Sequence, residues 1–349
     1  MPVPRVVLVT GVSRYLGGLV ARRLSALGEV DRVIGVDVIP PAHDIGTAEF
    51  VRADIRNPMI GKIIEQARVD TVVHMNVIAT PTFVGGRTPQ KEINVIGTMQ
   101  LLAACQKAPS VRRLVVKSTA AVYGSSPRDP AMFTEEMTAR RMPRTGFGKD
   151  SIEVEGYVRG FSRRRPDTEI AMLRFANIIG PHIRTSMTDY FGLPVLPVPF
   201  GYDARMQFMH EADATEAMLR ATLGSFTGVV NLAGDGVITV LQAAARLRRP
   251  LAPVPMAASG QVGSVARRLG LADFSPDQIS FLAFGRGLDT TVMREEFGFE
   301  PRYTTRETFE DFATSVRPVL PGPATALGVA GFVARGTGRL ARGIPGRAT

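Results

Sequence analysis

The chain has 349 residues, 45% of them hydrophobic, so it is long enough to bury a substantial core. No stretch approaches the ~20 apolar residues of a membrane span and no signal-peptide pattern opens the chain, so we expect a cytoplasmic protein. The formal net charge is +10, but no basic stripe interleaved with aromatic residues accompanies it, and we expect no nucleic-acid partner. The single cysteine, Cys105, excludes an intrachain disulfide, and the four histidines show no ligand spacing, so we predict no metal site.

The N-terminal segment 5–10 is an apolar, β-branched run that predicts a buried strand. It ends in the glycine-bearing turn 11–18, and apolar residues at helical spacing follow. Glycine lets the backbone approach a pyrophosphate, and a helix N-terminus adds free N–H groups and the positive end of its dipole. The pattern therefore predicts a dinucleotide site, the alternative being a tight strand-to-helix connection. The cofactor-binding candidates in this turn are Gly11, Ser13, Arg14, Leu16 and Gly17.

The second predicted strand, 32–37, ends in Asp37, 20 positions after Gly17. A carboxylate at this place can accept both hydroxyls of an adenine ribose, so Asp37 favours NAD over NADP. Arg14 stands where the usual pattern has its middle glycine. Its side chain must either point away from the phosphates or reach across to pair with them, and the sequence leaves open whether it blocks or assists the cofactor.

Strand and helix patterns alternate through the first half of the chain. Strands are predicted near 48–53, 70–75, 112–118 and 169–175, with helices near 58–67, 90–107 and 148–164. This order predicts an α/β fold with a doubly wound parallel sheet. We assign 1–180 with 207–248 to a dinucleotide-binding Rossmann domain, 181–206 with 249–318 to a smaller C-terminal substrate lobe, and 319–349 to a flexible basic tail rich in glycine and arginine.

Several motifs follow one another along roughly residues 4 to 313: Thr10-Gly11 with Gly17, Asp54-Ile55, and the segments 94–98, 118–124 and 174–181. Together they resemble the extended short-chain dehydrogenase/reductase family of the NAD-dependent epimerase/dehydratase type, and in particular actinobacterial members labelled UDP-glucose 4-epimerase. The resemblance implies NAD as cofactor, with Asp54 and Ile55 beside the adenine. It also implies a nucleotide sugar or another hydroxyl or keto compound as substrate, and a homodimer formed through helices 90–107 and 148–164.

In this family a Ser or Thr, a Tyr and a Lys act together: the phenolate takes a hydroxyl proton while the nicotinamide takes hydride, and the Lys lowers the pKa of the Tyr. Thr119 matches the first position, although a strand-end hydroxyl bonded to nearby backbone is an equal alternative. The Tyr-x-x-x-Lys segment is followed by a Glu four residues after the Lys, and Glu155 fixes that register. Phe147 then stands at the Tyr position and Ser151 at the Lys position, so neither the proton nor the cation is supplied.

A shifted register would make Lys149 the lysine but would put Thr145 at the tyrosine, so the acid/base pair is incomplete in both registers. The resemblance also implies which residue should bind the diphosphate of a nucleotide-sugar substrate. Met206 replaces the arginine that anchors the diphosphate in epimerases, and Arg205 lies one place away. Asn177 either contacts a polar substrate or holds the loop after the sixth strand.

Two functions follow from these residues. The chain is either an NAD-binding protein with weak or no catalysis, in a cofactor-sensing or scaffold role, or an active NAD-dependent epimerase or reductase that uses Thr119 and an unidentified acid/base group. The tail, with Arg335, Arg339, Arg342 and Arg347 and no acidic residue, either makes weak contact with an anionic membrane surface, binds an acidic partner, or stays solvated.

Overall fold

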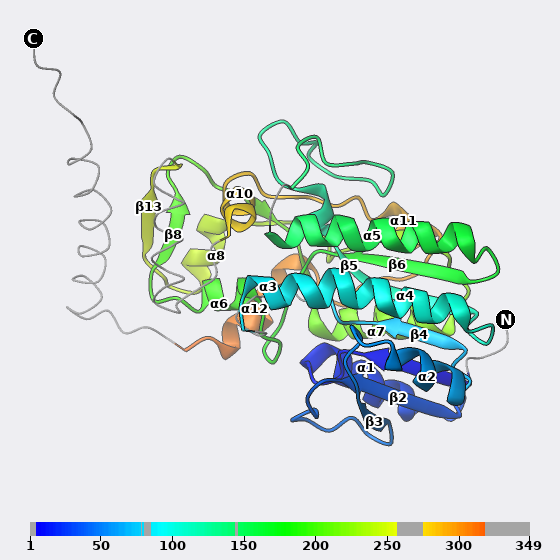
Figure 1. Ribbon diagram of the computed structural model, residues 1–349. Coiled ribbons are helices and arrows are strands. Elements are labelled where there is room, and N and C mark those ends of the chain that lie inside the picture. Colours follow the sequence, from blue (N-terminus) through cyan, green and yellow to red (C-terminus); the bar gives the residue numbers. More distant parts are fainter. Residues whose placement is uncertain (1–4, 78, 80–84, 144–145, 257–274, 318–349) are drawn as a thin grey trace, which may run out of the picture.

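The computed structural model describes residues 5–77, 79, 85–143, 146–256 and 275–317. Its centre is a seven-stranded parallel sheet with the order β3-β2-β1-β4-β5-β6-β11 (Figure 1). The strands are β1 (Val6–Thr10), β2 (Arg32–Asp37), β3 (Glu49–Arg52), β4 (Thr71–His74), β5 (Arg113–Thr119), β6 (Glu169–Phe175) and β11 (Gly228–Leu232). The predicted doubly wound sheet is confirmed.

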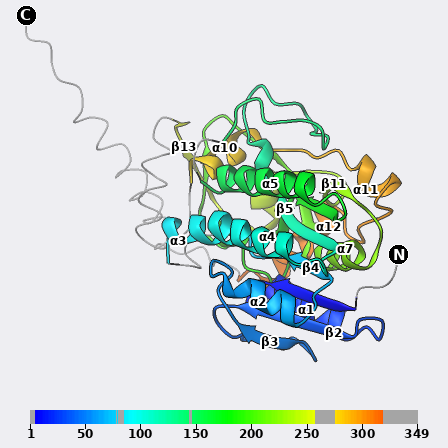
Figure 2. The same cartoon turned by 45° about the vertical axis from the view of Figure 1, so that its right-hand side comes forward.

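Helices cover both faces of this sheet (Figures 1 and 2). One face carries α2 (Met59–Gln66), α4 (Thr98–Lys107) and α5 (Gly146–Arg164), whose buried apolar residues share one core with those of the sheet. The opposite face carries α1 (Tyr15–Ser25) and α7 (Glu211–Leu223), which form a second core with the strands. The sheet is therefore buried on both sides, as its nearly continuous apolar strands predict.

The predicted helix near 90–107 consists of three consecutive pieces. These are α3 (Arg87–Lys91), a π-helical turn η2 (Glu92–Gly97) and α4. Within the π-helical turn the Asn94 carbonyl accepts a hydrogen bond of 2.5 Å from the Thr98 hydroxyl. That hydroxyl also lies 2.8 Å from Nε2 of His74, which ties the helix to the end of β4.

The order of the strands reverses between β1 and β4. From β1 the chain runs outward to β2 and β3, and from β4 it runs the other way to β5 and β6. The loops that leave the carboxyl ends of β1 and β4 therefore diverge, and the crevice between them is where open α/β sheets bind ligands.

A smaller group of elements with its own hydrophobic core lies beyond these carboxyl ends (Figure 1). Its parallel pair consists of β8 (Leu196–Pro199) and β13 (Leu251–Val254). The helices around it are α6 (Ser186–Phe191), α8 (Val240–Arg246), α10 (Pro276–Phe284) and α12 (Thr305–Ser315). Short strands link the two regions: β7 (Asn177–Ile179) pairs with β10 (Phe208–His210), and β9 (Arg205–Met206) pairs with β12 (Ile238–Thr239).

The remaining described elements are the 3₁₀ turn η3 (Ala120–Tyr123) and α11 (Thr291–Glu295). Among the helices of the described residues, none combines the length and the apolar composition that crossing a membrane requires. The basic tail predicted at 319–349 lies outside the described residues.

Candidate functional site

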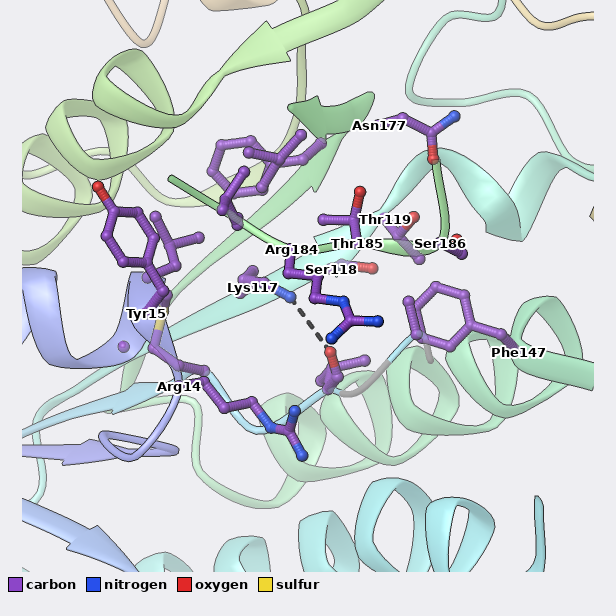
Figure 3. Close-up of a pocket in the computed structure, with 18 of the residues that line it drawn as sticks. Arg14, Tyr15, Lys117, Ser118, Thr119, Phe147, Asn177, Arg184, Thr185 and Ser186 are labelled. Carbon is purple, nitrogen blue, oxygen red and sulfur yellow. Dashed lines mark hydrogen bonds between the residues drawn. The ribbon is translucent and has the colours of Figure 1, made fainter. Parts of the chain in front are cut away.

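A pocket of about 420 Å³ opens at the carboxyl ends of the central strands (Figure 3). Its walls come from the turn after β1, the ends of β5 and β6, the start of α5 and the loop 182–186. Segments far apart in the sequence meet here because parallel strands end at one edge of the sheet. The predicted site residues that line it are Ser13, Arg14, Leu16, Gly17, Thr119, Phe147 and Asn177.

The turn between β1 and α1 has the shape of a phosphate cradle. Gly11 has φ +77°, a conformation that costs glycine little and other residues much. A Cβ atom on Gly17 would lie 2.2 Å from the carbonyl oxygen of Gly11, so only glycine permits this close approach of helix and turn. The residues present therefore fit a pyrophosphate held against the N-terminus of α1.

Asp37 is directed toward the same turn from the end of β2. Its side chain accepts hydrogen bonds from the Ser13 N–H at 3.0 Å, the Ser13 hydroxyl at 2.5 Å and the Val38 N–H at 2.7 Å. A carboxylate has about four lone-pair sites, so acceptor capacity remains for a ribose hydroxyl.

Arg14 immediately precedes α1 in extended conformation, with φ −92° and ψ 147°, and its side chain lines the pocket (Figure 3). Burial lowers the pKa of the guanidinium, while the charge of Asp37 raises it. Because the pKa of arginine starts so high, the group stays cationic.

Helix α5 is held against β5 and β6 by Glu155, whose side chain is 2% exposed. The carboxylate accepts a hydrogen bond of 2.6 Å from the Ser118 hydroxyl and two, of 2.6 and 2.9 Å, from the guanidinium of Arg174. Phe147, at the start of the same helix, lines the pocket. Ser151 is 1% exposed and donates its hydroxyl to the Phe147 carbonyl at 2.9 Å.

The lysine of the shifted register lies elsewhere on α5. The Lys149 side chain is 45% exposed, pairs with Glu153 at 3.7 Å and does not line the pocket. Thr145, its partner in that register, lies outside the described residues. Neither the position of Ser151 nor that of Lys149 brings an ammonium group beside Phe147.

Thr119 ends β5 inside the pocket and caps η3, since its hydroxyl accepts a hydrogen bond of 3.2 Å from the Ala121 N–H. The structure thus shows the backbone contact given above as the alternative for Thr119, together with exposure to the pocket. Asn177 begins β7 and also lines the pocket.

Lys117 is a pocket residue that the sequence analysis missed. It lies on β5 two residues before Thr119, on the same face of the strand, and donates to the Val77 carbonyl at 3.2 Å (Figure 3). Burial lowers the pKa of its ammonium group to about 8, and the nearby charge of Arg14 contributes to the shift. The signal that could have identified it is a lysine directly after the buried apolar run 114–116 and two residues before the Ser/Thr candidate at the end of the strand.

The rim of the pocket holds a second group of polar residues that the sequence did not reveal. Glu211 lies 2.7 Å from Nδ1 of His182 and accepts a hydrogen bond of 3.2 Å from the Tyr15 hydroxyl. Burial, followed by the charge of Glu211, raises the pKa of Tyr15 to about 12. Arg184, on the same loop as His182, donates to Asp189 at 2.8 Å.

Three predicted residues lie away from the pocket. Asp54 pairs with Arg56 at 2.6 Å, and Ile55 is 3% exposed in the core. Arg205 lines a separate cavity of about 820 Å³ together with Arg286. Arg286 is held there by hydrogen bonds to the Gly124 carbonyl and the Ser125 hydroxyl, at 2.7 and 3.1 Å.

The sheet order, the glycine cradle and the acidic residue that ends β2 define a Rossmann-type dinucleotide-binding fold. Residues 7–233 match the model of the NAD dependent epimerase/dehydratase family, and the chain belongs to that family. An uncharacterized protein of Mycobacterium tuberculosis is 48% identical over 313 residues, which cover 88% of this chain and 83% of that protein.

Solved structures show the same fold. UDP-glucose 4-epimerase of Thermotoga maritima, crystallised with UDP-glucose, has a TM-score of 0.69 at 21% identity and covers 89% of this chain and 98% of its own. UDP-glucose 4-epimerase of Thermus thermophilus, in complex with NAD, has a TM-score of 0.68 at 21% identity and covers 90% of this chain and 100% of its own.

Proposed function

We propose that this chain is an NAD(H)-binding member of the family that has lost the acid/base pair, catalyses weakly or not at all, and senses or holds its cofactor. The observation that carries the proposal is the arrangement at the start of α5. Phe147 lines the pocket, and Ser151 lies buried with its hydroxyl bonded to the Phe147 carbonyl.

The turn after β1 supports the cofactor part of the proposal. Gly11 and Gly17 would form the cradle for the diphosphate, Asp37 would meet the adenine ribose, and Arg14 would pair with the diphosphate from the pocket wall. When bound, the nicotinamide would supply a site that accepts or donates hydride. The carboxylate of Asp37 would repel a 2′-phosphate, which favours NAD over NADP.

The proton-transfer part of the site is what the chain lacks. Proton transfer to or from a substrate hydroxyl needs a titratable group within hydrogen-bond reach. A phenylalanine ring has none, and the Ser151 hydroxyl is engaged by the backbone. We therefore expect UDP-sugars, the compounds with which related proteins were crystallised, to turn over slowly or not at all.

One observation favours the second candidate, an active epimerase or reductase acting on a nucleotide sugar or another hydroxyl or keto substrate. Lys117 brings an ionisable amine into the pocket on the same strand face as Thr119. An amine whose pKa lies near 8 can exchange protons at neutral pH. In that case Lys117 is the acid/base group that the sequence left unidentified.

The two candidates are separated by measuring binding and turnover on one preparation. NAD binding is followed by calorimetry, and conversion of UDP-glucose to UDP-galactose by chromatography, with an active epimerase as positive control. The proposal predicts NAD binding without conversion. Robust conversion by the wild-type chain would overturn the non-catalytic role.

A homodimer is part of the same proposal. The support for it is a group of exposed apolar side chains on neighbouring helices: Ile96 is 42% exposed, and Met99 and Tyr157 are each 37% exposed. We expect light scattering after size exclusion to give twice the chain mass, and Met99→Glu to shift the protein toward monomer. A monomeric wild type would refute the homodimer.

A further inference from the structure

We infer that this pocket selects the reduced cofactor, because Lys117 places a positive charge at its nicotinamide end, where the neutral ring of NADH is accommodated and the cationic ring of NAD⁺ is repelled. The inference rests on the proposed function, namely that the pocket binds a nicotinamide dinucleotide. It adds a preference for one redox state, which a sensing role requires.

The fold fixes which end of a dinucleotide Lys117 would meet. Asp37, at the end of β2, marks the adenine side, and the glycine turn after β1 marks the diphosphate. The other half of the molecule must then extend over β4, β5 and β6. Lys117 lies on β5 and is bonded to the Val77 carbonyl in the segment after β4 (Figure 3). Its ammonium group is therefore on the nicotinamide side of the cradle.

The charged side chains that line the pocket itself are all basic, although Glu211 contacts Tyr15 and His182 at its rim. Arg14, Lys117 and Arg184 line it, and the lining residues that the structure describes include no Asp or Glu. This charge suits a diphosphate, whose negative charge is the same in both redox states and so cancels in the comparison. Only the nicotinamide ring differs, since it carries one positive charge in NAD⁺ and none in NADH.

Several ionisable groups surround Lys117. Arg14 faces it from the turn after β1, and His74 from β4. Tyr15, His182 and Arg184 lie at the rim, where Glu211 contacts both Tyr15 and His182. His74 is neutral, because burial and then the charge of Lys117 lower its pKa to about 3. A lysine is charged below its pKa, so the preference for NADH should be full in mildly acidic solution and should fade as the pH rises past about 8.

The expected effect is large enough to measure. At an effective dielectric constant of about 20, two unit charges about 10 Å apart change a binding constant by roughly tenfold. We therefore expect wild-type protein at neutral pH to bind NADH about tenfold more tightly than NAD⁺.

The test is calorimetric titration of NAD⁺ and NADH into wild type, Lys117→Gln, Lys117→Arg and the control Lys149→Gln. Lys117→Gln should bring the two affinities close together, chiefly by tightening NAD⁺, whereas Lys117→Arg keeps the charge and the preference. Lys149→Gln should leave the ratio unchanged because Lys149 lies outside the pocket and pairs with Glu153.

Equal affinities in wild type, or an unaltered ratio in Lys117→Gln, would overturn the inference while leaving dinucleotide binding intact. Binding of neither nucleotide to wild type would overturn the proposed function as well. The wild-type ratio between pH 6.5 and pH 9.5 gives a second readout that needs no variant. A ratio that stays constant across that range would also contradict the inference.

Discussion

Glu155→Gln tests the contacts that set the register of α5. The Glu155 side chain is 2% exposed and that of Arg174 is 8% exposed, so their ion pair is buried. Glutamine keeps the size of the side chain but has one acceptor oxygen and no charge. The guanidinium of Arg174 would then stay buried without a counter-charge, and the Ser118 hydroxyl would compete for the remaining oxygen.

Removing one partner of a buried ion pair destabilises a protein by about 3–5 kcal/mol. Because the amide retains one acceptor, we expect Glu155→Gln to lower the free energy of unfolding by about 3 kcal/mol. Glu153→Gln is the matched control on the same helix, since Glu153 is 31% exposed and pairs with the exposed Lys149. Glu153→Gln should lower the free energy of unfolding by less than about 0.5 kcal/mol.

The assay is urea-induced unfolding of the three proteins, with linear extrapolation to water. Two probes, circular dichroism and intrinsic tyrosine fluorescence, should give the same midpoint for each protein if unfolding is two-state. A loss in Glu155→Gln as small as that in Glu153→Gln would show that the pair is not buried. It would then refute the buried ion pair as the contact that fixes α5 against β5 and β6.

Three further measurements test the site. Gly17→Ala should weaken NAD binding at least tenfold in calorimetry, because the new Cβ would lie 2.2 Å from the carbonyl oxygen of Gly11. The control Gly28→Ala should leave binding unchanged, because a Cβ atom there would have no neighbour within 4 Å. Wild type should bind NAD at least tenfold more tightly than NADP because Asp37 repels a 2′-phosphate, and equal affinities would remove that role. Phe147→Tyr combined with Ser151→Lys should gain measurable UDP-glucose epimerisation by chromatography, and no gain in a folded, NAD-binding variant would show that the substrate side has been lost too.

The sequence predicts the framework of the site because each signal is local. Apolar β-branched runs identify the strands, and the glycines that follow β1 identify the turn. Thr119 and Phe147 meet because of the strand order, which follows from the alternation of strands and helices. Glu155 predicts the helix register through its spacing from Ser151, and its buried ion pair gives that register a physical basis.

The residues that the sequence analysis missed depend on how loops fold back over the sheet. The path of the chain after β7 decides that His182 and Arg184 form the rim. Arg205 is carried to a separate cavity because β9 pairs with β12. Lys117 belongs to a correctly predicted strand, but whether its ammonium group meets solvent, a carboxylate or a pocket is set by the turn after β1 and the segment after β4.

The measurement that tests the central claim most directly is to denature freshly purified protein and identify any released nucleotide by chromatography and mass spectrometry. A cofactor held by the cradle and by Asp37 should survive purification, and we predict release of NAD(H) with the reduced form enriched. Release of no nucleotide, together with no binding of added NAD or NADP on titration, would contradict the account. In that case Arg14 would close the site rather than hold the diphosphate.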